Sequence, residues 1–353
     1  MNFKTFIKKY TMVIALVVVF IFFAFLTGGR TLMAQNVSNL VLQNAYVLVM
    51  ACGMLLCILT GGNVDLSVGS TLCLSAALSA KLLSVGAPAP VAILASIALG
   101  SVIGVWQGYL IGYVHIPPFI CTLGGMFLFR GFARVILDSR TIAVSNQAFL
   151  NLFGSYINIP GLDTQNHCVS ALSSYLKTGI IAVLIVIYSS KLMQYKGIPV
   201  MLLWILVVVL IFAFLTSSTV FGRYFYAVGG NEKATKLSGI DPRKVYFRAY
   251  FWMSFLAAFS GLLMATRIGS VDGNMGNSFE MDAIASCFIG GASAYGGSGT
   301  VPGIMIGALL LGVINQGMSI FGLSDMWQYV VKGGVLLAAV VFDVVSNHKT
   351  GKS

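Results

Sequence analysis

The feature that most constrains this chain is a series of long apolar runs joined by short polar connections. Runs such as those at roughly 11–27, 40–60 and 301–321 approach the about 20 residues with which a helix crosses hydrocarbon. A bilayer offers no water to unpaired backbone groups, so repeated runs of this length favour helices. We therefore predict an all-α polytopic membrane protein, a single transmembrane domain over residues 1–353, with about ten transmembrane helices.

Composition supports this prediction and argues against nucleic-acid binding. Charged residues make up 9% of the chain, whereas soluble domains carry about 25%. The net charge of +11 comes from Lys and Arg scattered over short connections, which is typical of positive-inside topology. We expect membrane lipid around the protein and no nucleic-acid partner. None of the six cysteines forms a C-x-x-C pair, so neither a metal site nor a disulfide framework is indicated.

The start of the chain allows two interpretations. Residues 1–10 are basic and precede an apolar run, as in a cleaved secretory signal. The many later runs and the lack of a small-x-small cleavage site favour an uncleaved first span. We expect the N-terminus, and the basic C-terminus with it, in the cytoplasm.

A glycine-rich segment, GGNVDLSVGS at 61–70, interrupts the apolar pattern and carries a lone acid, Asp65. Such an acid can cap the helix that follows by accepting backbone N–H bonds. An ionisable side chain near membrane depth is costly, so it usually lines a protected interior or a water path. The residues alone leave both interpretations open, an ordinary polar turn and part of a transport path.

The fifth span begins at a proline pair, in the segment IPPFICTLGG at 116–125. Prolines suit a first helical turn, where the missing N–H is not needed. Thr122 in that turn can bond within the helix or face a path. Farther along, Arg130 and Arg134 are four residues apart, and we interpret them as snorkelling to the outer interface. A polar outer loop at about 138–173 follows.

Residues 222–246 form the longest charged stretch after the N-terminus. Within it, the sequence predicts a short helix from Glu232 toward Asp241, with Asn231 as its cap and Gly239 near its end. Such a helix across a cytoplasmic loop is a docking element by shape. A solvated basic loop explains the charge equally well.

A second glycine-rich break lies toward the C-terminal end of the chain. The apolar stretch at 283–294 is too short to cross unaided and runs into a glycine-rich segment at 295–303. Short, glycine-interrupted helices at two places in a transporter point to its central pathway. The glycines that we assign to these breaks are Gly61, Gly62, Gly69, Gly290, Gly291, Gly296, Gly297 and Gly299. The candidate path residues are Asp65, Ser67, Phe119, Thr122, Asn315 and Gln316.

Four segments resemble one family in family order. GGNVDLSVGS at 61–70, IPPFICTLGG at 116–125, GGNEKATKLSGI at 229–240 and the glycine-rich stretch at 267–303 are similar to permease subunits of bacterial ABC importers for monosaccharides. This is the ribose, xylose, galactose and multiple-sugar group. The stretch at 36–56 is most similar to the multiple-sugar type.

The resemblance implies partners and a mechanism. It implies a second permease copy or homologue, a cytoplasmic ABC ATPase that uses ATP and Mg²⁺, and an extracytoplasmic sugar-binding protein. It implies alternating access in the bacterial inner membrane, with no cofactor bound by the permease itself. The ATPase-coupling residues that it implies are Gly229, Gly230, Asn231, Glu232, Lys233, Lys236, Ser238, Gly239 and Ile240.

The topology is least certain around residues 178–190. This apolar run of about 13 residues falls below the about 17 that a crossing needs. If it crossed as well as 198–216, the basic stretch at 222–246 would lie outside, against the positive-inside rule. We therefore expect 178–190 to be a short or partly inserted helix; an eleventh span is the alternative.

Other function classes find little support in the sequence. The chain has no G-x-x-x-x-G-K-[ST] nucleotide loop, no H-E-x-x-H and no G-x-S-x-G, and its three histidines are far apart. We therefore predict a transport subunit rather than an enzyme. A stand-alone facilitator or an ion-coupled transporter is the alternative, and the segment at 229–240 argues against it. The sequence does not name the sugar.

Overall fold

The computed structural model describes residues 3–157 and 198–349, and this part of the chain is almost entirely helical. Two pairs of two-residue antiparallel strands join loops: β1 (Ile142–Ala143) with β4 (Ser270–Val271), and β2 (Tyr156–Ile157) with β3 (Ile198–Pro199). The helices are α1 (Phe3–Leu26), the 3₁₀-helix η1 (Arg30–Leu32), α2 (Ala34–Leu59), α3 (Val68–Ser84), α4 (Ala89–Gly112), α5 (Pro118–Ile136), α6 (Gln147–Gly154), α9 (Val200–Ser218), α10 (Val220–Gly230), α11 (Glu232–Leu237), α12 (Pro242–Ile268), α13 (Phe279–Ile289), α14 (Val301–Phe321) and α15 (Asp325–Lys349).

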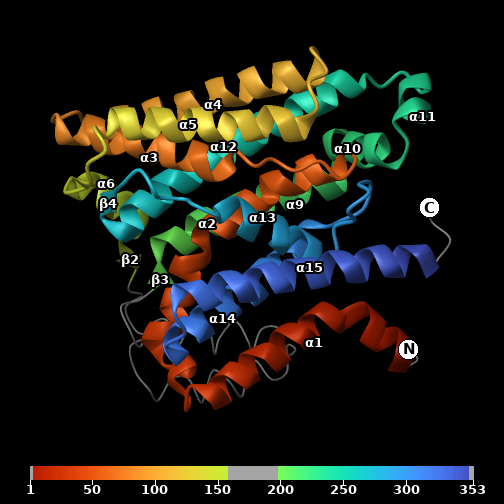
Figure 1. The fold of residues 1–353 in the computed structure, drawn as a ribbon, viewed down its shortest axis with the longest axis horizontal. Helices are drawn as coiled ribbons and strands as arrows, with labels where there is room; N and C mark the ends of the chain where they lie inside the picture. The colour runs from red at the N-terminus through yellow and green to blue at the C-terminus, as the bar shows by residue number, and fades with distance from the viewer. Residues whose placement is uncertain (1–2, 158–197, 350–353) are drawn as a thin grey trace.

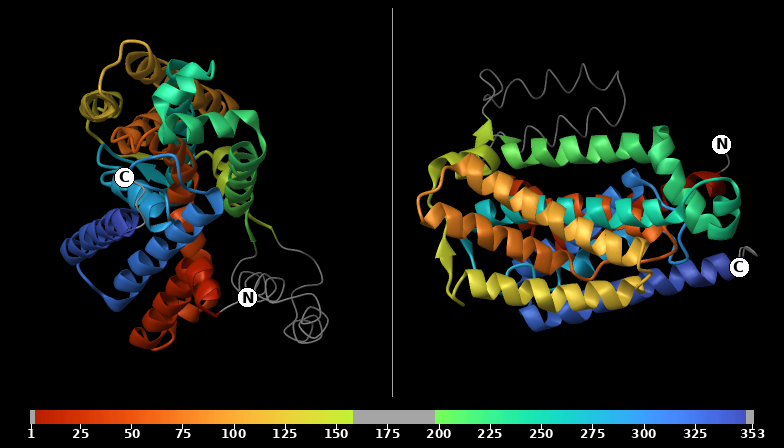
Figure 2. Two further views of the ribbon diagram at one scale, coloured as in Figure 1. Left: turned by 90° about the vertical axis from the view of Figure 1, so that its right-hand side faces the viewer. Right: turned by 90° about the horizontal axis from the view of Figure 1, so that it is seen from above.

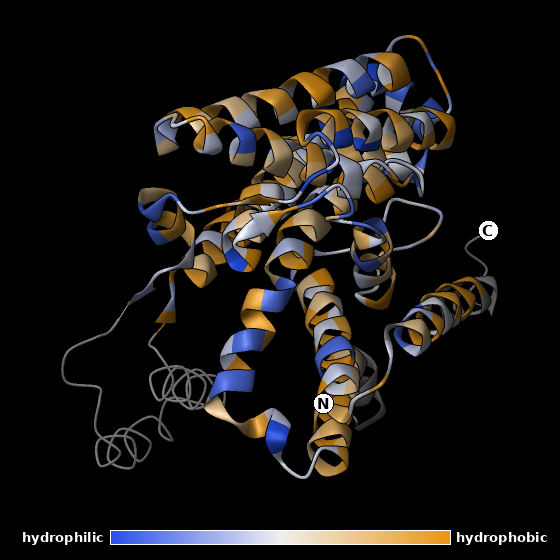
Figure 3. Ribbon diagram, turned by 60° about the vertical axis from the view of Figure 1, so that its left-hand side comes forward, coloured by the Kyte–Doolittle hydropathy of each residue, from blue (hydrophilic) through white to orange (hydrophobic). Residues whose placement is uncertain are grey.

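Six of these helices are long and apolar enough to cross a membrane: α2, α4, α5, α9, α12 and α14. Shorter apolar segments lie within α1, α3 and α15. Hydrophobic residues cover most turns of the long helices (Figure 3). The prediction of an all-α polytopic membrane protein is therefore confirmed. The apolar run at 178–190 lies outside the described residues.

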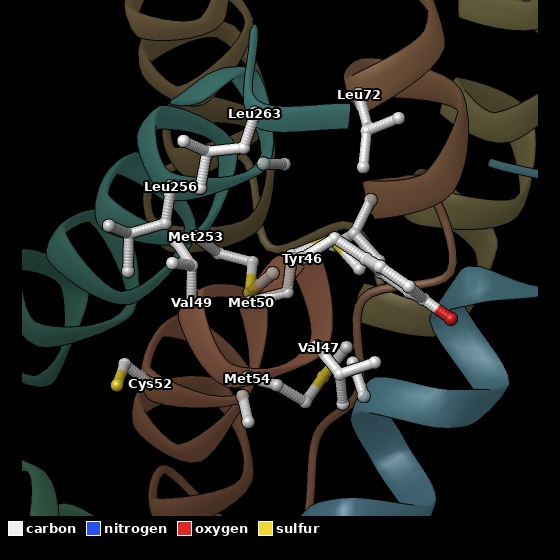
Figure 4. Packing of buried hydrophobic residues seen from close by; sticks show 14 of the residues in the cluster. Tyr46, Val47, Val49, Met50, Cys52, Met54, Leu72, Met253, Leu256 and Leu263 are labelled. Atoms are coloured by element: carbon white, nitrogen blue, oxygen red, sulfur yellow. The ribbon is translucent and has the colours of Figure 1, made fainter. Parts of the chain in front are cut away.

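Helix α2 forms the centre of the bundle. From Val47 to Leu59 every side chain is essentially inaccessible, apart from a slight exposure of Leu48. Helix α12 packs along α2, α3 and α4 (Figure 1). Met50 and Met54 of α2 lie beside Met253 and Leu256 of α12 (Figure 4). A helix that is apolar on all sides and buried on all sides holds the other helices in place.

Helices α4 and α12 approach closely along a row of glycines. Gly100, Gly104, Gly108 and Gly112 recur every fourth residue, and each faces the backbone or Cβ of α12. A methyl group added at Gly104 would lie 2.8 Å from the Cα of Phe251. Small residues at this spacing let two helix backbones meet without a hydrophobic driving force in lipid. The four-residue spacing of these glycines is typical of tight helix packing, and the structure supplies the partner helix.

The two ends of the bundle are named after the helices that lie there. At the α11 end lie α10, α11, the start of α1 and the end of α15, whereas α6, β1 and β4 lie at the opposite, α6 end (Figure 1). Helices α5 and α15 lie along the same side of the bundle (Figure 2). We call this side the α5–α15 face. Its exposed side chains are largely apolar and include Phe127, Phe132, Val330 and Leu337.

Several element boundaries differ from expectation. Residues 220–230, expected as part of a charged loop, form the helix α10. Helix α12 begins at Pro242, within the stretch expected as a charged loop, because Asp241 caps it and Pro242 occupies the first turn. Helix α13 spans 279–289 rather than 283–294. The outer segment at 138–157 is not a plain loop, since it contains β1, α6 and β2.

Candidate translocation path and coupling surface

Helix α11 is built from strong local signals. The Asn231 side chain accepts a hydrogen bond from the backbone N–H of Ala234 at 2.9 Å, which is an N-cap. The Thr235 hydroxyl donates to the carbonyl of Ala227 at 2.7 Å and so ties α11 back to α10. Gly239 follows in a left-handed conformation with φ +84° that ends the helix. Leu237, at 90% exposure, projects from this element without cover.

The two glycine-rich breaks meet each other beside α10. The backbone N–H of Gly297 donates to the carbonyl of Leu59 at 3.0 Å, directly before the first break. The carbonyl of Ala294 fills the space that a side chain at Gly62 would need. Gly229, in the last turn of α10, is pressed equally closely against the carbonyl of Leu59. The breaks, which are far apart in sequence, therefore form one joint with the helix that leads to α11.

Asp65 lies in the interior and takes part in a polar network. Its Oδ1 accepts from the backbone N–H of Ser67 at 2.8 Å and from the Ser67 hydroxyl at 2.7 Å. Gln107 of α4 donates to the Ser67 hydroxyl at 2.9 Å, and the hydroxyl of Ser254 of α12 donates to Gln107 at 3.3 Å. The Asp65 carboxylate therefore stabilises the turn just before α3. Through Ser67, this turn is connected to α4 and α12.

This network is incompletely satisfied within the described residues. The second carboxylate oxygen of Asp65 and the hydroxyl of Tyr250 are buried and have no hydrogen-bond partner there. Gln107, Tyr250 and Ser254 were not selected from the sequence. The one signal in the sequence was the amide of Gln107 within an apolar helix, because a buried polar side chain in a membrane span needs a hydrogen-bond partner.

The other predicted path residues fall into separate places. Thr122 is buried and donates to the carbonyl of Pro118 at 2.9 Å, whereas Phe119 is 58% exposed near the start of α5. Gln316 of α14 donates to the carbonyl of Asn36 and so joins α14 to α2. The Oδ1 of Asn315 is buried without a partner in the described chain. Asp65, Ser67 and Thr122 belong to the side of the bundle with α3, α4 and α5, and α14 packs on the other side of α2.

The two arginines of α5 bond to the loop at 272–278, and Arg134 remains exposed there. The Arg130 guanidinium donates to the carbonyls of Gly273, Met275 and Gly276, and Arg134 donates to the side chain of Asn274 at 3.2 Å. The location of these arginines at the outer interface stays a prediction, and the loop at 272–278 supplies their hydrogen-bond acceptors. Helix α5 thereby holds the segment that leads into α13.

A cleft of about 620 Å³ opens at the α11 end. Its walls come from α11, the start of α12, the turn before α5 and Asn63 of the first break. Both acids in the wall are engaged: Glu232 accepts from the Tyr246 hydroxyl at 3.1 Å, and Asp241 accepts from the backbone N–H of Arg243 at 3.1 Å. The cleft places α11 and α5 around the same space. No cluster of three or more His, Cys, Asp or Glu occurs among residues 3–157 and 198–349.

Comparison with known proteins identifies the family. Residues 36–340 match the family described as branched-chain amino acid transport system / permease component. The chain belongs to this permease family. It is therefore a transmembrane permease component of an ABC importer, and the family assigns it no catalytic role and no cofactor of its own.

The curated relatives are sugar permeases. The chain is 37% identical to the xylose transport system permease protein XylH of Haemophilus influenzae, over 97% of this chain and 98% of the relative. It is 34% identical to the ribose import permease protein RbsC of Escherichia coli, over 88% and 85%. It is 33% identical to the galactose/methyl galactoside import permease protein MglC of Haemophilus influenzae, over 87% and 86%. No solved structure matches the chain. Similarity to the multiple-sugar type stays a prediction.

Proposed function

We propose that this permease component imports a monosaccharide, a pentose or hexose, by alternating access driven by a separate ATPase. The observation that carries the mechanism is the joint beside α10, where Gly229 packs on Leu59 and Gly297 bonds to the same residue. A displacement of α11 is therefore transmitted to both glycine breaks through the direct contacts at this joint. The three sugar-permease relatives support the substrate class.

The orientation follows from charge. Arg223, Lys233, Lys236, Arg243 and Lys244 gather at the α11 end, which makes that end cytoplasmic by the positive-inside rule. The start of α1 and the end of α15 lie there too, so both termini are cytoplasmic. In this assignment residues 222–246 are the coupling loop, 138–173 is the outer loop, and about ten helices, or eleven, cross the inner membrane within one domain.

We assign each of the three partners to a different part of the surface. The ABC ATPase, which binds ATP and Mg²⁺, docks on α11 through Leu237 and the coupling residues at 229–240. The sugar-binding protein docks at the α6 end. A second permease copy or homologue faces the α5–α15 face, and the path runs between the copies, near Asp65, Ser67, Phe119 and Thr122. Asn315 and Gln316 lie across α2 from this group.

A reconstituted uptake assay tests the proposal. The permease is expressed with its ATPase and binding protein, and uptake of labelled D-xylose, D-ribose and D-galactose is measured. We expect uptake of at least one sugar, and its loss when the ATPase carries a substitution that abolishes hydrolysis. Equal uptake by the permease without any ATPase would instead establish a facilitator or an ion-coupled transporter.

A further inference from the structure

A small recess lies between α13 and α15, at the start of both helices. It has a volume of about 120 Å³ and is lined by Asn277, Ser278, Phe279, Gln328, Tyr329 and Lys332. These side chains come from two elements that the family motifs do not single out for a ligand. One wall of the recess belongs to α15, a helix of the α5–α15 face that we assign to the path.

The floor of the recess is held by a buried ion pair. The Lys332 ammonium lies 3.1 Å from the carboxylate of Asp282, whose side chain is only 2% exposed. The hydroxyl of Tyr46 donates to the same carboxylate at 2.7 Å. The ring of Phe279 stacks on Tyr46 at a centroid distance of 3.8 Å. Two of the lining residues are therefore fixed by one network, which pre-organises this wall.

The surface of the recess offers both hydrogen-bond donors and hydrogen-bond acceptors to a ligand. An ammonium has three N–H donors, and those of Lys332 not directed at Asp282 are free for a ligand. Gln328 donates its amide to the carbonyl of Leu323 at 3.1 Å, which leaves its own carbonyl oxygen as an acceptor. Asn277 is exposed, and its side chain has no partner in the described part of the chain. Hydroxyl groups both donate and accept, so they match such a mixture.

Charge and shape narrow the ligand class further. Lys332 is the only charged residue of the six that line the recess, and Asp282 neutralises it. A recess without net charge does not favour an ion. The exposed ring of Tyr329 offers an apolar surface for the C–H face of a ring. The volume holds only part of a monosaccharide, which suits a weak subsite on a path that a solute must also leave.

We propose that the recess between α13 and α15 is a transient subsite for the sugar during its passage, with Gln328, Asn277 and Lys332 as its hydrogen-bonding groups. This inference rests on the proposed sugar transport and adds the residues that contact the solute. It also gives the chain a means of preferring neutral polyhydroxyl solutes over charged amino acids.

Protection from chemical labelling tests the subsite directly. In the full-length chain with Cys168→Ser, Ser278→Cys, which lines the recess and keeps the three proposed hydrogen-bonding groups, is labelled with a maleimide in the purified transporter. The five cysteines among the described residues are buried, so their background is low. We expect D-xylose, D-ribose or D-galactose at about 50 mM to slow labelling about tenfold or more if the site has millimolar affinity. Met326→Cys, on α15 and 82% exposed outside the recess, is the control and should not be protected.

A second measurement uses transport itself. Gln328→Ala and Asn277→Ala should each lower the maximal uptake rate about fivefold to tenfold, as expected for one lost hydrogen bond. The KM should not change, because the binding protein captures the sugar first. Ser101→Ala on α4 is the control, because this hydroxyl donates to the carbonyl of Ile97 within its own helix.

The outcomes separate the two proposals. Absence of uptake by the wild-type transporter would overturn the proposed function, and the labelling result would still decide the subsite. Normal uptake together with equal labelling of Ser278→Cys in the presence and absence of each sugar would overturn the subsite alone. Protection of Met326→Cys to the same degree would also overturn it, since it would indicate a general closure of the protein.

Discussion

At the scale of single residues, Asp65 is an interior acid that is held by neutral partners. No arginine or lysine of the described residues bonds to Asp65, which is held by Ser67 and, through Ser67, by Gln107. An acid at mid-membrane costs about 2.5–3.5 kcal/mol on insertion scales. Backbone and hydroxyl donors offset part of this cost, and the unpaired oxygen of Asp65 shows that they do not offset all of it.

Substitution at Asp65 distinguishes geometry from charge. Asn retains an oxygen for the Ser67 N–H and hydroxyl, so we expect Asp65→Asn to melt within a few degrees of wild type and to transport. Asp65→Leu removes the acceptor and leaves buried donors unpaired, which should cost about 1–3 kcal/mol. Thermal melting in detergent and sugar uptake measure both effects. A well-folded but inactive Asp65→Asn protein would mean that the charge itself is used.

The glycine row on α4 supports a second prediction at this scale. Gly104→Ala places a methyl group against the Phe251 backbone, and we expect a loss of about 1–3 kcal/mol from overpacking. Gly131→Ala on α5 is the matched control, because no atom lies within 4 Å of the added carbon. That change should be neutral or stabilising, since alanine favours a helix by about 1 kcal/mol. Equal melting temperatures of the two variants would contradict the packing argument.

At the scale of elements, local signals predicted more than long-range ones. Asn231 and Gly239 delimit α11 in the sequence, and the structure places a helix between them. Helix α10 was missed because its mixture of aromatic residues, glycines and one arginine gives no clear period. The segments at 61–70 and 290–303 were selected as glycine breaks, but their mutual contact depends on how α2 and α13 pack, which no local pattern encodes. Gln107 and Tyr250 were missed for the same reason.

Helix α11 offers a test of coupling. Leu237 is almost fully exposed, so Leu237→Asp should leave folding unchanged while placing a charge where an apolar contact with the ATPase is expected. We expect normal membrane levels, at least about tenfold less ATPase bound after purification, and loss of uptake. Leu152→Asp on α6, an exposed leucine at the opposite end, is the control for ATPase binding alone. Undiminished ATPase binding by Leu237→Asp would remove α11 from the docking surface.

At the scale of the whole molecule, the arrangement of the described helices gives a testable orientation. Ser238→Cys, at the exposed end of α11, should react with a membrane-impermeant maleimide only after cells are opened. Val85→Cys, 70% exposed in the connection between α3 and α4, should react in intact cells. Labelling of Ser238→Cys in intact cells would reverse the orientation and would refute the coupling assignment as well.

The close contact of α4 with α12 also bears on how the protein is made. Gly112 ends α4 and Pro242 begins α12, so about 130 residues of synthesis separate the two. At roughly 5–20 residues per second, α4 waits on the order of ten seconds for its partner. During that interval its glycine row faces lipid or the insertion machinery with the backbone uncovered. Substitutions such as Gly104→Ala should therefore leave insertion of α4 intact and fail afterwards, when α12 arrives, so that the defective chains are found in the membrane and are degraded there.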